Sequence, residues 1–530
     1  MLIIFFITLF LYLFLVGSCM DYVDYDFFAR LIVGKTFFQT GDILKYDFLS
    51  YSKTHPWWDH EWGSSIVFYF VQDHFQDVGL QVLKAICLFV TFVFFVLIIQ
   101  LRRKNLTPDK EFPIFNFLFF FFALQPISNL VFSLRCHHFT FMFFAIWLYV
   151  MEKARLEKNY RIMWVLPLLM IVWSNMHGGC FMGLGITGLY IIGEFLRKKP
   201  FLPYIYLFIA SFLVMFINPY GVEYVTFLVK ATTMNRPNIV EWQPPFGSYF
   251  MAKFIKFKIV LLFFMGLSVY RFYKTWLQTK ACGKLNKLKE IWNNMDKTKA
   301  VLVFVMFLLT MKSIRFISYF IFILVPFCYD DFYSIFNKKL APKYNKMKEL
   351  ILFYIVLFVF FLNITVRDLK YGNFHSIFPL SEIEYLIENN VKGNVFVPFE
   401  CGSYASYKLY PNNFILQDGR YEEVYSPYLN DEHVRLITLG GVGWKEALNS
   451  VHHDIIIPYK HYNLYENLKH HPDYYLVLES RTFALFIRKE VYHRMKKPAR
   501  IPTDEPEFYK KILWNTQIDW LKKWKKFLFR

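Results

Sequence analysis

Residues 81–101 read QVLKAICLFVTFVFFVLIIQL, and this apolar stretch decides the fold class. A helix needs roughly 20 mostly apolar residues to cross a bilayer, and this run has that length. Comparable runs recur near residues 2–19, 112–132, 136–151, 162–175, 178–196, 201–217, 255–273, 299–312, 314–330 and 349–364. The sequence therefore predicts a mainly α-helical polytopic transmembrane bundle of about 11 spans.

Composition and charge agree with a membrane protein. The chain has 530 residues and is 56% hydrophobic and 21% aromatic, which is rare among soluble domains. Its net charge of +19 could suggest nucleic acid, but the basic residues gather in alternate loops near 102–104, 153–161, 197–199, 280–299 and 338–348. The positive-inside rule makes these loops cytoplasmic. We therefore expect a multi-pass inner-membrane protein that contacts membrane lipids and no nucleic acid.

The remaining loops set the predicted orientation and domains. The first outer loop, residues 20–80, is acidic and should face outward, which puts the N-terminus in the cytoplasm and the C-terminal domain outside. We expect a transmembrane domain over 1–364 that includes this loop. An outer, periplasmic-side α/β domain should follow over 365–490. The basic, aromatic tail 491–530 should lie at the membrane interface.

The outer domain shows its elements in the pattern of apolar residues. Residues 381–388 have helical spacing, with Ser381 and Glu384 as a capping pair at the start. Strands are predicted at 393–398, 413–416 and 453–457, with a closing pair at 474–478 and 483–488. The outer stretch 218–254 is rich in turn residues and should form an ordered cap rather than a long helix.

Two carboxylates, Asp24 and Asp26, follow the first predicted span. A carboxylate beside the bilayer could be a general base for an acceptor hydroxyl. The pair could instead hold a divalent cation such as Mg²⁺ or Mn²⁺ that neutralises a phosphate leaving group. The simplest alternative is a solvated loop, but the crowding of acidic and aromatic residues near a membrane favours a functional role.

The same loop contains Trp57-Trp58-Asp59-His60-Glu61-Trp62. Aromatic rings stack on sugar faces, and His60 and Glu61 add ionisable groups, so Trp58, His60 and Glu61 are candidate substrate-binding residues. Tryptophan also anchors at membrane interfaces for purely physical reasons, and the two interpretations carry equal weight.

Basic residues at span ends form a second group of candidates. Arg135 and Arg315 should both lie on the outer side, where a guanidinium can bind a phosphate through two oxygens. The alternative is that they extend to lipid head groups. His138, beside His137, is a poor chelate, because two adjacent histidines rarely bind one ion. His177 ends another span at the same side and could orient a substrate.

Other motifs are absent or structural. The sequence contains no nucleotide-binding glycine loop and no Ser-His-Asp order. Asp418-Gly419-Arg420 is best interpreted as a structural turn with an arginine–carboxylate tie. The scattered cysteines predict no disulfide framework.

Taken together, these residues resemble a bacterial family of the GT-C glycosyltransferase superfamily. The matching positions are Asp24, Asp26, Leu31, Gly34, Asp47, Phe48, Ser50, Tyr51, Trp58, His60, Glu61, Trp62, Asn175, His177, Asn218, Glu241, Trp242, Gly402, Asp418 and Arg420. The chain departs from the family pattern at Phe27, Phe28 and Arg30, where the family has Trp-Trp-His.

The resemblance implies a membrane glycosyltransferase that moves a sugar from a polyprenyl-phosphate-linked donor to an envelope acceptor, which could be a lipid, a glycan or a protein. Asp26 or Asp24 would be the catalytic base. The expected substrate-binding residues are Asp47, Trp58, His60, Glu61, Arg135, His138, His177 and Arg315.

Two alternatives remain open at this stage. One is a non-catalytic envelope assembly or scaffold protein that binds through its outer domain. The other is a transporter, which is less favoured because the charges sit at span ends rather than at mid-membrane.

Overall fold

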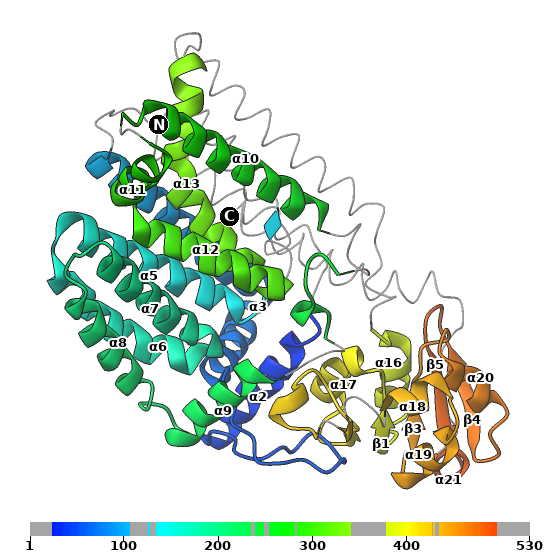
Figure 1. Cartoon of the computed structure of the whole chain (residues 1–530). Coiled ribbons are helices and arrows are strands. Elements are labelled where there is room, and N and C mark those ends of the chain that lie inside the picture. Colours follow the sequence, from blue (N-terminus) through cyan, green and yellow to red (C-terminus); the bar gives the residue numbers. More distant parts are fainter. Residues whose placement is uncertain are drawn as a thin grey trace, which may run out of the picture. The chain divides into compact units, whose positions relative to one another are not determined.

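The structure is a computed structural model, which describes residues 24–106, 126–127, 134–234, 239–247, 254–280, 283–340, 378–426, 428–429 and 434–495 (Figure 1). These residues form two compact units. The helical unit holds Asp24, residues 33–44 and the described residues from Trp58 to Leu340. The C-terminal unit holds residues 25–32, 45–57 and the described residues from Phe378 to Met495.

Helices build almost all of the helical unit, as the apolar runs predict. They are α3 (Trp62–Leu106), α5 (His137–Glu157), α6 (Val165–Met176), α7 (Phe181–Leu196), α8 (Leu202–Val214), α9 (Val222–Thr233), α10 (Ile255–Gln278), α11 (Lys284–Asn294), α12 (Lys297–Lys312) and α13 (Ile317–Leu340). Short 3₁₀ turns join them at η2 (Tyr160–Trp164), η3 (Gly178–Cys180), η4 (Val240–Trp242) and η6 (Ile314–Phe316). Helix α3 packs along α5, and α7 packs along both α8 and α12. The mainly helical class is confirmed.

The long helix α3 is interrupted at Gln76, whose backbone angles (φ 56°, ψ −157°) are not helical. A residue with this conformation cannot continue the i→i−4 hydrogen-bond ladder, so the helix divides there. The break at Gln76 lies five residues before the predicted span at 81–101, so the span is a helical stretch of its own.

Two described helical segments, Trp62–Asn105 and Gly178–Leu196, are long and apolar enough to cross a membrane. Shorter apolar helices lie at Tyr160–Met176, Leu202–Val214 and Ile314–Tyr329. The predicted spans at 2–19, 112–132 and 349–364 fall outside the described residues or almost entirely so. The number of about 11 spans therefore stays a prediction.

A buried ion cluster joins four of the helices at one end. Its residues, which we call the Glu152 cluster, are Arg102, Glu152, Arg155, Glu194 and Asp296. Arg102 donates to Glu152 at 2.5 Å, and Arg155 donates to both oxygens of Asp296 at 3.0 Å. Each charge has an opposite partner, which is the condition under which buried charges are tolerated.

The C-terminal unit is a small α/β fold. Its helices are α16 (Leu380–Glu388), α17 (Gly402–Leu409), α18 (Val434–Leu439), α19 (Trp444–Ser450), α20 (Asn463–Lys469) and α21 (Lys489–Arg494), with turns η8 (Phe399–Cys401) and η9 (Tyr421–Glu423). Its strands are β1 (Gly393–Phe396), β2 (Asn413–Ile415), β3 (Ile455–Ile456), β4 (Tyr474–Glu479) and β5 (Ala484–Arg488).

The five strands form one mixed sheet in the order β2-β1-β3-β5-β4. Strand β1 is parallel to β2 and β3, while β5 is antiparallel to β3 and β4. The predicted strands and the closing pair are therefore confirmed. Apolar residues from β1, β3 and β5 pack with α16 and α17 to form the core.

Two stretches of the first loop belong to this C-terminal unit rather than to the helical unit. Residue Ser50 pairs with Ile415 at the edge of β2, and Leu49 and Tyr51 exchange backbone hydrogen bonds with the same residue. Phe28, at the start of α2 (Phe27–Thr40), packs its ring 5.0 Å from that of Tyr404. The two loop stretches belong to this unit because they bury apolar side chains against it and because residue 50 pairs with the edge of β2.

Two details differ from the sequence-based expectation. Helix α16 begins one residue earlier than predicted, its N-cap is Pro379, and no side chain caps it, so the capping role of Ser381 is wrong. Ser381 already lies in the first helical turn. The stretch 218–254 also contains the twelve-residue helix α9, which its turn residues did not predict. The border predicted near residue 364 lies outside the described residues, as does nearly all of the tail after 490.

Candidate functional site

The polar end of the helical unit is built from the turns that connect its helices. His60 and Glu61 precede α3, Arg135 precedes α5, and His177 lies between α6 and η3. Glu241 lies in η4 and Arg315 in η6. These helices carry the Glu152 cluster at their other ends, so the two sets of charges occupy opposite ends of α3, α5, α7 and α12.

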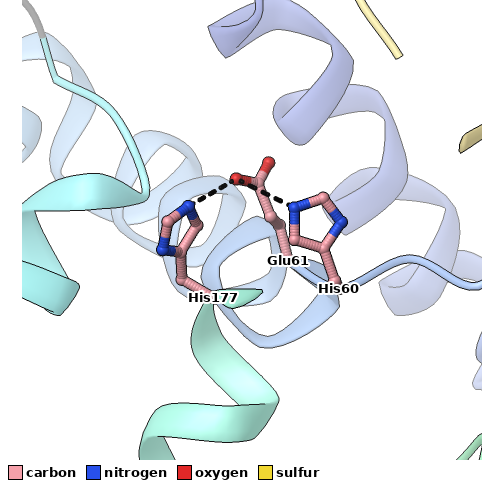
Figure 2. A group of neighbouring side chains, drawn as sticks. All are labelled: His60, Glu61 and His177. Atoms are coloured by element: carbon pink, nitrogen blue, oxygen red, sulfur yellow. Dashed lines mark ion pairs between the residues drawn. The ribbon is translucent and has the colours of Figure 1, made fainter. Parts of the chain in front are cut away.

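Glu61 lies between two histidine rings (Figure 2). Its Oε1 is 3.3 Å from Nε2 of His177 and 3.9 Å from Nε2 of His60. The rings approach closely because residue 178 is glycine: a Cβ there would lie 2.7 Å from Cδ2 of His60. A side chain at this position would push His60 away from Glu61.

The tautomer of His177 is set by its other ring nitrogen. Nδ1 accepts a hydrogen bond from the backbone N–H of Gly179 at 3.0 Å. Thr140 Oγ1 lies 2.7 Å from the same nitrogen and accepts from Trp173 Nε1, which leaves its own hydrogen to donate to Nδ1. The neutral ring therefore carries its proton on Nε2, the atom that faces Glu61. Burial lowers the pKa of His177 more than nearby Glu61 raises it, which favours the neutral ring.

This tautomer decides whether the three residues suit a metal ion. Their ligand atoms lie within 4.8 Å of one another, but two nitrogens and a carboxylate are a zinc-like set, whereas Mg²⁺ and Mn²⁺ prefer oxygen. A metal ligand must also offer a lone pair, and Nε2 of His177 carries a hydrogen. In this tautomer His60, Glu61 and His177 do not suit a metal ion, and Nε2 of His177 faces Glu61 Oε1 at 3.3 Å. The divalent cation expected at Asp24 and Asp26 stays a prediction.

Arg135 links two carboxylates. Its Nε forms an ion pair with Asp24, and its Nη1 donates to Glu241 Oε1 at 2.7 Å. Burial alone would raise the pKa of Glu241, but the charges of Arg135 and Arg315 outweigh it and hold the pKa below its usual value. Both predicted arginines therefore act on one carboxylate.

Arg315 reaches the same short segment from the other side. Its guanidinium lies over the Trp242 ring at 4.9 Å and its Nη2 donates to His137 Nε2 at 3.3 Å. Ser313 Oγ donates to the backbone oxygen of Glu241 at 2.8 Å, which fixes η4 against η6. The His137 ring in turn lies 4.4 Å from that of His177.

These contacts define one connected group, which we call the His177 cluster. Its members are Asp24, His60, Glu61, Arg135, His137, His177, Glu241 and Arg315. Six of them are site residues that the sequence predicted, and His137 and Glu241 were not. Glu241 could have been predicted from its position beside a tryptophan in an outer loop. His137 could have been predicted from its position near Arg135.

Two further predicted residues border this group. The Trp58 ring lies 6.4 Å from Phe227, which also lies 5.7 Å from His60, so an aromatic surface adjoins the cluster. His138 is buried, and its Nδ1 lies 3.0 Å from the backbone oxygen and 3.2 Å from the backbone nitrogen of Arg135. Its ring supports the turn before α5, while the neighbouring His137 contacts Arg315.

Asp47 and Asp26 belong to the C-terminal unit. Arg420 Nη1 donates to Asp47 at 2.5 Å, and both side chains are fully buried. Burial would raise the pKa of Asp47, but the guanidinium of Arg420 outweighs it and holds the pKa below its usual value. Asp26 is half-buried and lies against Gly419. The structural turn expected at 418–420 is present.

Comparisons with known proteins bear on the fold. No protein-family model matches the chain, and no curated protein sequence matches it. Among solved structures, the chain is similar to the oligosaccharyltransferase of Archaeoglobus fulgidus in its apo form, with a TM-score of 0.55 and 10% sequence identity. The likeness covers 86% of this chain and 69% of that one. At this identity the likeness shows the fold alone.

Proposed function

We propose that the chain is a membrane glycosyltransferase of GT-C type that moves a sugar from a polyprenyl-phosphate-linked donor to an envelope acceptor. The observation that carries the proposal is the convergence of Arg135 and Arg315 on the Glu241–Trp242 segment. The fold shared with an oligosaccharyltransferase and the two helical segments long enough to cross a membrane support it.

The two guanidiniums suit a phosphate. A guanidinium forms two parallel hydrogen bonds to phosphate oxygens, and its charge does not depend on pH in the physiological range. In the proposed reaction they bind the phosphate of the lipid carrier and stabilise the negative charge that builds on it as the sugar leaves. Glu241 holds Arg135, while Trp242 and His137 contact Arg315, and the more highly charged phosphate replaces Glu241 or shares Arg135 with it.

The proposed chemistry is a single displacement. The acceptor hydroxyl loses its proton to a carboxylate, its oxygen bonds to the anomeric carbon, and the bond from that carbon to the phosphate oxygen breaks. Polyprenyl phosphate leaves, and the configuration inverts. We take Asp26 as the base that receives this proton; the other predicted carboxylate, Asp24, forms an ion pair with Arg135.

Glu61 is proposed to accept hydrogen bonds from sugar hydroxyls. Nε2 of His177 lies 3.3 Å from one of its oxygens, and His60 lies beside it with a half-buried ring. The half-buried Trp58, which packs against the buried Phe227, supplies aromatic surface next to these polar groups, a combination that suits the mixed polar and apolar faces of a sugar. No step of the proposal uses a metal ion.

A turnover assay tests the proposal without knowledge of the acceptor, because water can replace it. The purified full chain in lipid nanodiscs is given synthetic polyprenyl-phosphate hexoses, and release of polyprenyl phosphate is measured. Wild type is expected to release it, and Arg315→Lys is expected to be slower by roughly 10- to 100-fold, because an ammonium cannot contact two oxygens.

Lys312→Arg is the matched control, since it changes a basic residue near the same turn that the proposal does not use. It should release polyprenyl phosphate at the wild-type rate. Absence of release by wild type across glucose-, galactose-, mannose- and N-acetylglucosamine-linked donors would count against the function. Equal rates for wild type and Arg315→Lys would remove Arg315 from it.

A further inference from the structure

We infer that the C-terminal unit positions the catalytic base: the Asp418–Gly419–Arg420 turn holds the Asp26 carboxylate, and Gly419 is a positioning residue for transfer. This inference rests on the proposed function, in which Asp26 takes the acceptor proton. It gives the C-terminal unit a part in the chemistry itself.

The contact between Asp26 and Gly419 is unusually close. A Cβ built on Gly419 would lie 1.9 Å from Oδ1 of Asp26 and 3.1 Å from its carboxyl carbon. The next neighbour, Ser403 Oγ, would be 3.7 Å away, which is an ordinary contact. The absence of a side chain at 419 therefore makes room for one group in particular, the carboxylate of Asp26.

Backbone conformation does not explain this glycine. Gly419 is not among the residues with positive φ, so alanine could adopt its backbone angles without strain. The added methyl group would meet the far end of a short, rotatable side chain, which can swing aside. A Gly419→Ala chain should therefore fold and carry a displaced Asp26 carboxylate.

The turn itself is held rigidly. Asp418 Oδ1 accepts from Arg420 Nε at 2.8 Å and from Tyr425 at 3.2 Å, and Arg420 also donates to Asp47. The Arg420 guanidinium lies 4.8 Å from the Trp57 ring. All five side chains are buried. This buried network fixes the turn against which the Asp26 carboxylate lies, and a functional group is held in place best by neighbours whose own conformations are locked.

Other glycines of the same unit supply controls. At Gly441, a Cβ would meet Leu436 Cδ1 alone, at 3.6 Å, so Gly441→Ala should change nothing. At Gly402, a Cβ would lie 2.2 Å from the backbone oxygen of Gln417, which cannot swing aside. Gly402→Ala should therefore destabilise the fold, and its lowered melting temperature is the reference for a glycine with a purely structural role.

The test measures release of polyprenyl phosphate from synthetic polyprenyl-phosphate hexoses by the full chain in nanodiscs, together with its melting temperature. Gly419→Ala is expected to lower kcat by roughly 10- to 100-fold, while KM for the donor stays within about twofold. Its melting temperature should match that of Gly441→Ala. The double variant Gly419→Ala/Asp26→Asn should be no slower than Asp26→Asn, because the glycine acts through a group already removed.

Each other outcome overturns the inference. Gly419→Ala with wild-type kcat, or with effects that add to those of Asp26→Asn, would show that Gly419 does not act through Asp26. A Gly419→Ala chain that loses its melting transition, as Gly402→Ala should, would show that the fold needs the glycine. A slow Gly419→Ala beside a fully active Asp26→Asn would refute Asp26 as the base, and no release by wild type would refute the proposed function itself.

Discussion

The two ends of the helical unit use the same charged groups in different ways. In the Glu152 cluster the side chains of Arg102, Glu152 and Arg155 are 3%, 0% and 2% exposed, and each contacts opposite charges at hydrogen-bond distance. In the His177 cluster the side chains of Arg135 and Glu241 are 29% and 44% exposed. At the first end the charged side chains are buried and paired with one another. At the second end Arg135 and Glu241 remain partly accessible to solvent.

The difference teaches what each cluster is for. Buried and mutually satisfied charges fix how helices pack but offer nothing to a ligand. Arg135 pairs with the partly exposed Glu241, and a guanidinium can exchange such a partner for another anion. Substitutions at the first end should therefore change stability, and substitutions at the second end should change activity.

The largest expected effect is on stability. Glu152→Gln removes the carboxylate shared by Arg102 and Arg155 and leaves buried positive charge, which should lower the free energy of unfolding by about 3–5 kcal/mol. Glu241→Gln breaks a partly exposed pair and should cost about 0–1 kcal/mol. Denaturant unfolding of the full chain in nanodiscs compares the two. Similar costs would mean that both ends are structural.

The next effect is on turnover. Arg135→Lys keeps one positive charge but cannot reach Asp24 and Glu241 together, so release of polyprenyl phosphate should slow by about tenfold or more. Its melting temperature should stay near that of wild type. Arg155→Lys, the matched change at the closed end, should show the reverse pattern. An Arg135→Lys chain that is unstable but fully active per folded molecule would break the comparison.

A smaller effect concerns pH. Because the folded-state pKa of His177 is lowered, the unfolded chain binds its proton more readily. The contribution of His177 to the free energy of unfolding is therefore fully present above the pKa of the unfolded chain, about 6.5. It is lost as the pH falls from that value toward the lower pKa of the folded chain. His177→Gln should flatten stability between about pH 6.5 and 5. An unchanged slope would show that His177 titrates normally in the fold.

The smallest expected effect is no effect. Zn²⁺ should leave the melting temperature unchanged, because Nε2 of His177 carries a hydrogen and cannot be a ligand. The measurement compares wild type with His60→Gln at the same Zn²⁺ concentration. A stabilisation by Zn²⁺ that His60→Gln abolishes would make the three residues a metal site and reverse the tautomer assigned to His177.

Local patterns in the sequence carried the prediction of single elements. Helix α16 and strands β1 to β5 lie where apolar spacing put them, because burial on one face imposes that spacing. The break at Gln76 also falls between two segments with different composition. The prediction that Ser381 caps α16 was wrong, because a Ser/Glu pair also fits the first turn of a helix whose N-cap is Pro379.

Long-range pairings could not be predicted in the same way. Asp47 meets Arg420, and residues 45–57 join the edge of β2, through contacts that no local pattern records. Arg135 and Arg315 were predicted because the expected topology puts both at one membrane face. Glu241 and His137 were missed, because choosing among neighbouring polar residues requires the direction of each side chain.

The central claim is that this chain transfers sugar from a lipid carrier, and mass spectrometry of envelope glycolipids and glycoproteins tests it most directly. Cells with the intact gene are compared with cells in which it is disrupted and with cells that carry Asp26→Asn or Gly441→Ala. The account predicts that one sugar is missing from an envelope glycan after disruption and in Asp26→Asn, and is present in Gly441→Ala. An envelope that is identical with and without the gene would contradict it.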